Sequence, residues 1–101
     1  MTRSESFLIA PDHPACSGHF PGRPILPGVV LLAEAANRIA ASLDLDPALA
    51  WQINRVKFLR PAFPGDSLQL HWERAAKGNI DFRIERAAEA LAEGSLRLRG
   101  T

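Results

Sequence analysis

The sequence predicts an α+β fold in which a curved antiparallel β-sheet wraps around one central α-helix. Apolar residues cover most of a helical circumference between positions 27 and 43, which is typical of a buried helix. After Trp51, apolar and polar residues alternate, as in antiparallel strands with one face on the core and one in water. A chain of 101 residues is expected to form a single domain, spanning 1–101.

The first element is predicted to be a short strand over Ser6–Ala10, an apolar run closed by Pro11 and Asp12. Positions 11–28 then hold five of the eight prolines and three of the seven glycines. Because proline fixes φ and removes a backbone donor, this segment is predicted to be an ordered loop without regular structure.

The central helix is predicted to begin at Pro27, where a missing N–H costs nothing, and to run to about Leu43. Pro47 follows as a stop signal. Polar residues interrupt the apolar surface on one narrow face, at the spacings i, i+3 and i+4. They are Glu34, Asn37 and Arg38.

Four antiparallel strands are predicted after the helix, separated by turn signals. A break at Arg60–Asp66 separates the first two strands, and Lys77-Gly78-Asn79 predicts a hairpin between the second and third. Ala87–Glu93 is interpreted as a connection plus the start of the last strand. The strands themselves are Trp51–Leu59, the run around Leu68–Trp72, the run around Ile80–Ile84, and a strand containing Leu96 and Leu98.

The composition excludes several classes of protein. A hydrophobic content of 47% argues against disorder, and a net charge of +1 argues against a general nucleic-acid binder. No apolar run reaches the roughly 18 residues that a membrane span needs. The single Cys16 rules out an intramolecular disulfide and fits a reducing compartment, so a cytoplasmic location is expected. A chain this short buries a thin core, which favours an oligomer.

A proline-rich loop before the helix holds the leading candidate for a catalytic base, His19. An imidazole titrates near neutral pH, which suits proton abstraction, and rigid loops commonly hold catalytic groups. The alternative is a loop histidine with a purely structural hydrogen bond. Cys16 lies three residues earlier, but this spacing is only weak support for a Cys–His nucleophile pair.

Gly28, at the predicted helix start, is a candidate backbone donor. The first helical N–H groups lack intrahelical partners and lie at the positive end of the helix dipole. A carbonyl oxygen placed there would be polarised as negative charge developed on it. The alternative is a glycine that only serves a turn.

Glu34 is the only acid on the helix before its end, and it could donate or accept a proton. Alternatively, it pairs with Arg38 at i+4 in the favourable orientation. His13 lies in the loop and His71 is expected to face outward from a strand. Neither has a partner at metal-ligand spacing, so no metal site is proposed.

Two motifs resemble those of a known family. The first comprises Gly18-His19-Phe20-Pro21 followed by Pro24-Ile25-Leu26-Pro27-Gly28-Val29. The second runs from Val56-Lys57-Phe58-Leu59-Arg60-Pro61 through Pro64-Gly65-Asp66 to Leu68. Their order and spacing are similar to those of the β-hydroxyacyl-[acyl carrier protein] dehydratases of fatty-acid synthesis. The resemblance covers roughly Phe7 to Leu98.

The resemblance implies a hotdog fold and a homodimer, or a higher even oligomer, with active sites at the subunit interface. It implies dehydration of a 3-hydroxyacyl-[acyl carrier protein] thioester to the trans-2-enoyl thioester without a cofactor. The family's base maps onto His19, its backbone donor onto Gly28 and a supporting residue onto Asn37. Phe20, next to the histidine, is a second supporting candidate.

The family's acid lies five residues after the Pro-Gly glycine, where this chain has Ala33, and Glu34 follows one place later. Glu34 of the partner subunit is therefore the expected acid. A basic rim is expected to receive the acidic acyl carrier protein: Arg23, Arg55, Lys57 and Arg60. Two alternatives are a non-catalytic acyl-thioester-binding hotdog subunit, favoured by Ala33, and a hotdog thioesterase.

Overall fold

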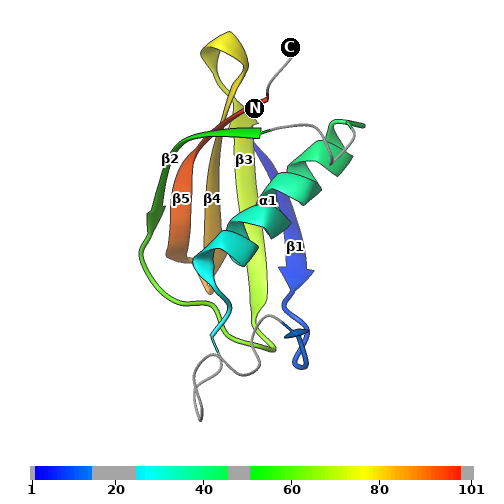
Figure 1. The fold of residues 1–101 in the computed structure, drawn as a ribbon, viewed down its shortest axis with the longest axis vertical. Coiled ribbons are helices and arrows are strands. Elements are labelled where there is room, and N and C mark those ends of the chain that lie inside the picture. Colours follow the sequence, from blue (N-terminus) through cyan, green and yellow to red (C-terminus); the bar gives the residue numbers. More distant parts are fainter. Residues whose placement is uncertain (1, 15–24, 46–50, 99–101) are drawn as a thin grey trace.

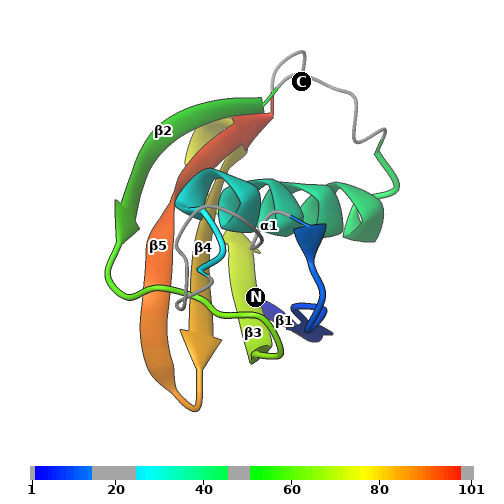
Figure 2. The same cartoon turned by 60° about the horizontal axis from the view of Figure 1, so that its bottom comes forward.

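The computed structural model describes residues 2–14, 25–45 and 51–98, which form an antiparallel sheet folded around one helix. The sheet has the strand order β1-β3-β4-β5-β2. Figures 1 and 2 show helix α1 lying across the concave face of this sheet. The elements are β1 (Arg3–Leu8), α1 (Gly28–Ser42), β2 (Trp51–Phe58), β3 (Ser67–Arg74), β4 (Asn79–Arg86) and β5 (Glu89–Leu98). The predicted α+β architecture is confirmed.

The core lies between α1 and the concave face of the sheet. The helix contributes a stripe of buried residues, including Leu31, Ala35 and Ile39. Alternate residues of β3 and β4 face this stripe, as the period of two predicts. Burying each large apolar side chain contributes about 1.5–3 kcal/mol. The large apolar strand residues that are fully or almost fully buried are Phe7, Leu68, Leu70, Trp72, Ile80, Phe82, Ile84, Leu91 and Leu96.

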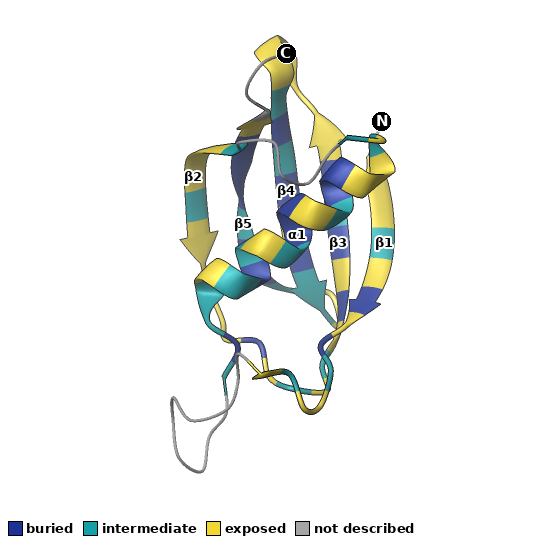
Figure 3. Cartoon of the chain, turned by 45° about the vertical axis from the view of Figure 1, so that its right-hand side comes forward, coloured by how far each residue is buried: buried dark blue, intermediate teal, exposed yellow. Residues whose placement is uncertain are grey.

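One stripe of α1 faces away from the sheet. Every fourth residue along it is exposed, from Val29 through Ala33 and Asn37 to Ala41. Figure 3 shows these exposed segments along the helix, opposite the buried side.

The described residues contain no helix that is long and apolar enough to cross a membrane.

The outer face of the sheet is polar, and His71 lies on it as predicted. Its Nδ1 lies 2.6 Å from Ser4 Oγ, and its Nε2 lies 3.1 Å from Glu85 Oε1. Arg83 Nε approaches the other Glu85 oxygen at 2.7 Å. This network joins three strands, β1, β3 and β4, on the face opposite the helix.

The first strand is displaced from its predicted position. It spans Arg3–Leu8 and not Ser6–Ala10, because it pairs with β3 from Arg3 opposite Trp72 to Leu8 opposite Ser67. Ile9 is buried beyond the strand, where its N–H donates to the carbonyl of Asp66 at 2.9 Å.

Two turns refine the second half of the sheet. Ala87 and Ala88 both have positive φ, 51° and 68°, and reverse the chain so that β5 begins at Glu89. This agrees with a connection followed by the last strand. The predicted hairpin at Lys77-Gly78 is present as a 3₁₀ turn in which both residues have positive φ, 62° and 77°.

Candidate functional site

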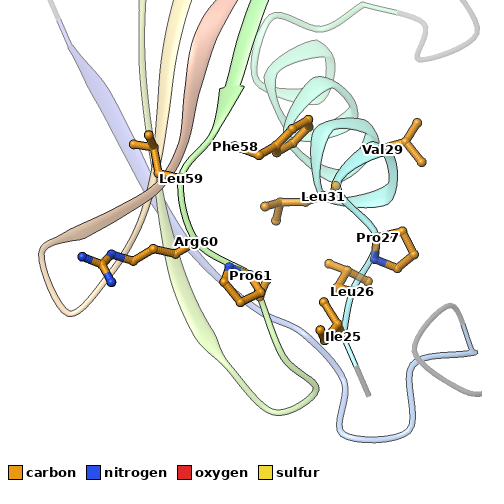
Figure 4. Close-up of a pocket in the computed structure, with 11 residues that line it drawn as sticks. Ile25, Leu26, Pro27, Val29, Leu31, Phe58, Leu59, Arg60 and Pro61 are labelled. Atoms are coloured by element: carbon orange, nitrogen blue, oxygen red, sulfur yellow. The ribbon is translucent and has the colours of Figure 1, made fainter. Parts of the chain in front are cut away.

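A cavity of about 490 Å³ opens beside the first turn of α1. One wall comes from the chain that enters the helix and from the helix start. The opposite wall comes from the end of β2 and the loop that follows it, as Figure 4 shows. The lining residues are Ile25, Leu26, Pro27, Gly28, Val29, Leu31, Phe58, Leu59, Arg60, Pro61 and Ala62.

The two walls are joined by backbone pairing. Leu26 N–H donates to the carbonyl of Ala62 at 2.9 Å, and these residues form an isolated antiparallel bridge. Leu59 and Arg60 N–H both donate to the carbonyl of Leu91, at 2.8 and 3.2 Å. The loop after β2 is thereby held between the helix entry and β5.

The helix begins where the sequence predicts. Pro27 caps α1 with extended dihedrals, φ −56° and ψ 141°, and its carbonyl accepts from Val30 N–H at 3.0 Å and Leu31 N–H at 3.1 Å. The earlier amides, at Gly28 and Val29, have no intrahelical acceptor and lie at the positive end of the dipole. Gly28 lines the cavity.

The interior of the cavity is apolar and buried, whereas its mouth is exposed. Leu26, Leu31 and Ala62 form the interior, with 1–2% of their surface exposed. Val29 and Leu59 stand at the mouth, with 71% and 47% exposed. An apolar chain of a ligand would be buried inside, while a polar head group would remain at the mouth.

The second sequence motif forms the loop beneath this cavity. Asp66 accepts from Phe63 N–H at 2.8 Å and from Arg86 Nη1 at 2.7 Å. Arg86 also donates to the carbonyl of Pro61 at 3.1 Å. Gly65 has φ +86°, in the left-handed region that favours glycine. The Pro-Gly-Asp turn therefore shapes and anchors the cavity wall.

The predicted basic rim is partly at the cavity. Arg60 lines it and pairs with Glu89 of β5, and Figure 4 shows its side chain extending away from the interior. Arg55 and Lys57 are exposed on β2, outside the lining. Arg23 lies outside the described residues, as do His19, Phe20 and Cys16.

Glu34 lies on the side of α1 toward β1 and does not line the cavity of its own chain. Its carboxylate is 3.7 Å from Arg38 Nη2, so the i, i+4 pair given above as the alternative role of Glu34 is present. Arg38 also lies 3.5 Å from Glu5 and stacks over the ring of Phe7, 4.5 Å from its centroid. Asn37 is exposed on the outer stripe of the helix.

Sequence reasoning singled out neither Phe58 nor Leu31 as site residues. Both are apolar members of ordinary strand and helix patterns, and only packing brings them to one cavity. The second motif did carry a signal, since Phe58 and Leu59 directly precede Arg60. Among the described residues, no three His, Cys, Asp or Glu side chains gather as metal ligands.

Comparison with known sequences gives one family. The model of a family described as ApeI-like, ApeI dehydratase, matches residues 3–95. A 3-hydroxyacyl-[acyl-carrier-protein] dehydratase FabZ from Thermus thermophilus is 33% identical over 97 residues, which cover 89% of this chain and 67% of that protein. FabZ from Anaeromyxobacter sp. is 37% identical over 83 residues, which cover 72% and 48%. The chain thus spans about half the length of some curated relatives that it matches.

Comparison with solved structures confirms the hotdog fold. The dehydratase heterocomplex ApeI:P from Xenorhabdus doucetiae has a chain with a TM-score of 0.77 and 27% identity, covering 96% of this chain and 86% of that one. The (R)-hydratase from A. caviae has a TM-score of 0.69 at 15% identity, covering 97% and 94%. The fluoroacetyl-CoA thioesterase FlK has a TM-score of 0.60 at 18% identity, covering 95% and 82%. The last two are similar in fold alone.

Proposed function

The chain belongs to the ApeI-like dehydratase family, and from this membership we propose that it removes water from a 3-hydroxyacyl thioester to give the trans-2-enoyl thioester. The observation that carries the proposal is the cavity beside the helix start. Its apolar interior is suited to an acyl chain, and Gly28 in its lining supports the proposal that a helix-start amide meets the thioester carbonyl.

The proposed reaction assigns one role to each group. His19 takes the α-proton, and the electrons of that C–H bond form an enolate whose oxygen accepts a hydrogen bond from Gly28 N–H. Collapse of the enolate forms the carbon–carbon double bond and expels the 3-hydroxyl. An acid protonates the departing hydroxyl, which leaves as water. Phe20 and Asn37 are proposed to support the site.

Glu34 of a partner subunit is the proposed acid in a homodimer or a higher even oligomer. With about a third of its side chain exposed, Glu34 is accessible to a neighbouring chain, and Asn37 lies on the exposed stripe beside it. The carboxylate would have to leave Arg38, a pair that such exposure makes weak. The proton-donating half of each site would then come from across the interface.

The substrate is proposed to arrive on an acyl carrier protein in the cytoplasm. The names of the FabZ relatives specify a 3-hydroxyacyl-[acyl-carrier-protein] substrate. Arg60 at the mouth, with Arg55 and Lys57 on the adjoining strand and Arg23 before the helix, would receive an acidic carrier. The single cysteine is in keeping with a reducing compartment.

The test is formation of enoyl thioester from 3-hydroxyacyl thioesters of a carrier protein and of coenzyme A. His19→Ala is expected to lower kcat by at least about 100-fold, whereas His71→Ala, on the opposite face of the sheet, should keep near-normal turnover. If the wild-type protein and His19→Ala are equally inactive on both thioesters, the dehydratase proposal fails. Release of free thiol instead of enoyl product would favour a thioesterase.

A second candidate is a half-site subunit that depends on a different hotdog chain for its acid. Ala33 on the exposed stripe and the Glu34–Arg38 pair favour it, and the Xenorhabdus relative is itself described as part of a heterocomplex. Glu34→Gln separates the two candidates. An active homodimer that loses about 100-fold in kcat with this variant supports Glu34 as the acid. Unchanged turnover, or turnover only after a second hotdog subunit is added, supports the half-site.

A further inference from the structure

We propose that Phe58 determines which acyl groups the cavity accepts, excluding branched or aryl groups and admitting straight chains. This inference rests on the proposed function, because it concerns the acyl group of the same substrate. Phe58 is the last residue of β2 and lines the cavity next to the helix start.

Phe58 packs directly against the helix start. A Cβ built on Gly28 would lie 3.0 Å from Cε1 and Cζ of the Phe58 ring and 3.2 Å from Cδ1. The aromatic ring therefore occupies the space beside the proposed carbonyl donor. Figure 4 shows the ring beside the first turn of α1, above the buried interior to which Leu31 contributes. An acyl chain that passes from Gly28 toward that interior must pass this ring.

Strand β5 presents small residues opposite this part of β2. The cross-strand partner of Phe58 is Ala92, and the partner of nearby Val56 is Gly94. Neither residue carries a side chain larger than a methyl group. The ring remains 48% exposed although it is large and apolar. An acyl chain lying against it would cover this surface, which is favourable.

The size of the ring then sets the width of the passage. A straight chain needs only the cross-section of one methylene, whereas a branched or aryl group beside the thioester would overlap the ring. The residues that form the interior cannot move aside to make room for a bulky group, because they are almost fully buried. They are Leu26, Leu31 and Ala62. Truncation of Phe58 should thus widen the entrance without opening the core.

The experiment compares Phe58→Ala and Phe58→Leu with the wild-type protein on straight, branched and aryl 3-hydroxyacyl pantetheine thioesters. For Phe58→Ala, the ratio of kcat/KM for the bulky over the straight substrate is expected to rise about tenfold, through KM more than kcat. Phe58→Leu should give a smaller rise. Leu8→Ala is the control, because Leu8 is also a large exposed apolar residue but lies outside the cavity. The inference is overturned if folded Phe58→Ala leaves the ratio unchanged, or if Leu8→Ala shifts it equally.

A binding measurement keeps this inference separate from the proposed reaction. Saturated acyl pantetheine amides, which can be neither dehydrated nor cleaved, are titrated calorimetrically into the same variants. The same shift in preference toward bulky groups is expected even if no dehydratase activity exists. Equal preference in the wild-type protein and Phe58→Ala would overturn the role of Phe58 while leaving the dehydratase assay untouched.

The contact between Gly28 and the Phe58 ring can be tested separately by measuring the melting temperature of variants. Gly28→Ala is expected to lower Tm by roughly 5 °C, because the new methyl group meets the Phe58 ring. In the double variant Gly28→Ala/Phe58→Ala, most of that loss should disappear relative to Phe58→Ala alone. If the two effects are simply additive, the ring does not pack where the inference requires it.

Discussion

Arg86 donates to the Asp66 carboxylate across 2.7 Å, and this bond ties the loop after β2 to strand β4. Both side chains are mostly buried, with 29% and 18% of their surfaces exposed. The same Arg86 reaches the carbonyl of Pro61 and lies over the ring of Phe63, 5.5 Å from its centroid. One side chain thus fixes three points of the loop that forms a wall of the cavity.

Asp66→Asn should remove the charge from this bond and lower the free energy of unfolding by about 1.5–3 kcal/mol. Urea denaturation of the two proteins measures the difference. Glu89→Ala serves as the control, because its ion pair with Arg60 is about half exposed on both sides, with side-chain exposures of 51% and 56%. That control should cost no more than about 1 kcal/mol. Equal losses in the two variants would contradict an anchoring role for Asp66.

Gly94→Ala should be among the most damaging small substitutions in the chain. Its methyl group would overlap the carbonyl oxygen of Arg55 and lie 2.9 Å from Cα of Val56, both in the backbone of β2. We expect a loss of about 3 kcal/mol, since overpacking against backbone cannot be relieved by a rotamer change. Gly65→Ala is the comparison, with φ +86° but no atom within 4 Å of the new methyl group. It should cost only about 1 kcal/mol in thermal or urea unfolding, and the reverse ranking would refute this explanation.

Ile39→Ala should create a cavity under the middle of α1. Ile39 has 0% exposure and belongs to the main apolar cluster, so a loss of about 2–5 kcal/mol is expected. Leu8→Ala, at a position 62% exposed, should change the free energy of unfolding by no more than about 0.5 kcal/mol. A large effect of Leu8→Ala would mean that another chain covers this residue in solution.

Arg60→Glu should weaken the use of carrier-bound substrate, because it reverses a charge at the mouth of the cavity. At low salt, kcat/KM for the carrier-protein thioester should fall about tenfold, while the uncharged pantetheine thioester keeps its value. Arg74→Glu is the control, since Arg74 lies with Arg3 and Leu43 at the opposite end of the helix. A similar decrease with Arg74→Glu would indicate a general charge effect and no docking at the mouth.

The sequence predicts the central helix to within about a residue at each end, because Pro27 and the residues before Pro47 mark its limits. The predicted position of the first strand differs from the observed one, because two polar residues of β1 face inward. Arg3 stacks over Trp72, 5.2 Å from the ring centroid, and Glu5 pairs with Arg38. Both contacts depend on residues more than 30 positions away, which a local pattern does not contain.

Strand β2 is a second element whose details the local sequence pattern does not predict. Its apolar residues Ile53 and Val56 are three apart, because the pairing with β5 shifts between Ile53 and Arg55. The extra residue, Asn54, bonds to Asn79 and Ser95 at 3.0 and 3.2 Å. At the site, the sequence singles out Gly28 and Arg60, which both line the cavity, but Phe58 joins them only through packing across 30 positions.

The strand order has a consequence for how the chain is made. Within the described sheet, β2 has a single neighbour, β5, which is the last strand in the sequence. While a ribosome is still synthesising residues 89–98, the helix start can form and Arg86 of β4 can hold the loop after β2, but β2 and its last residue Phe58 have no strand to pair with. The cavity beside the helix start is therefore completed only when β5 emerges. A nascent chain arrested just before Glu89 should carry the entire helix and yet lack one wall of this cavity.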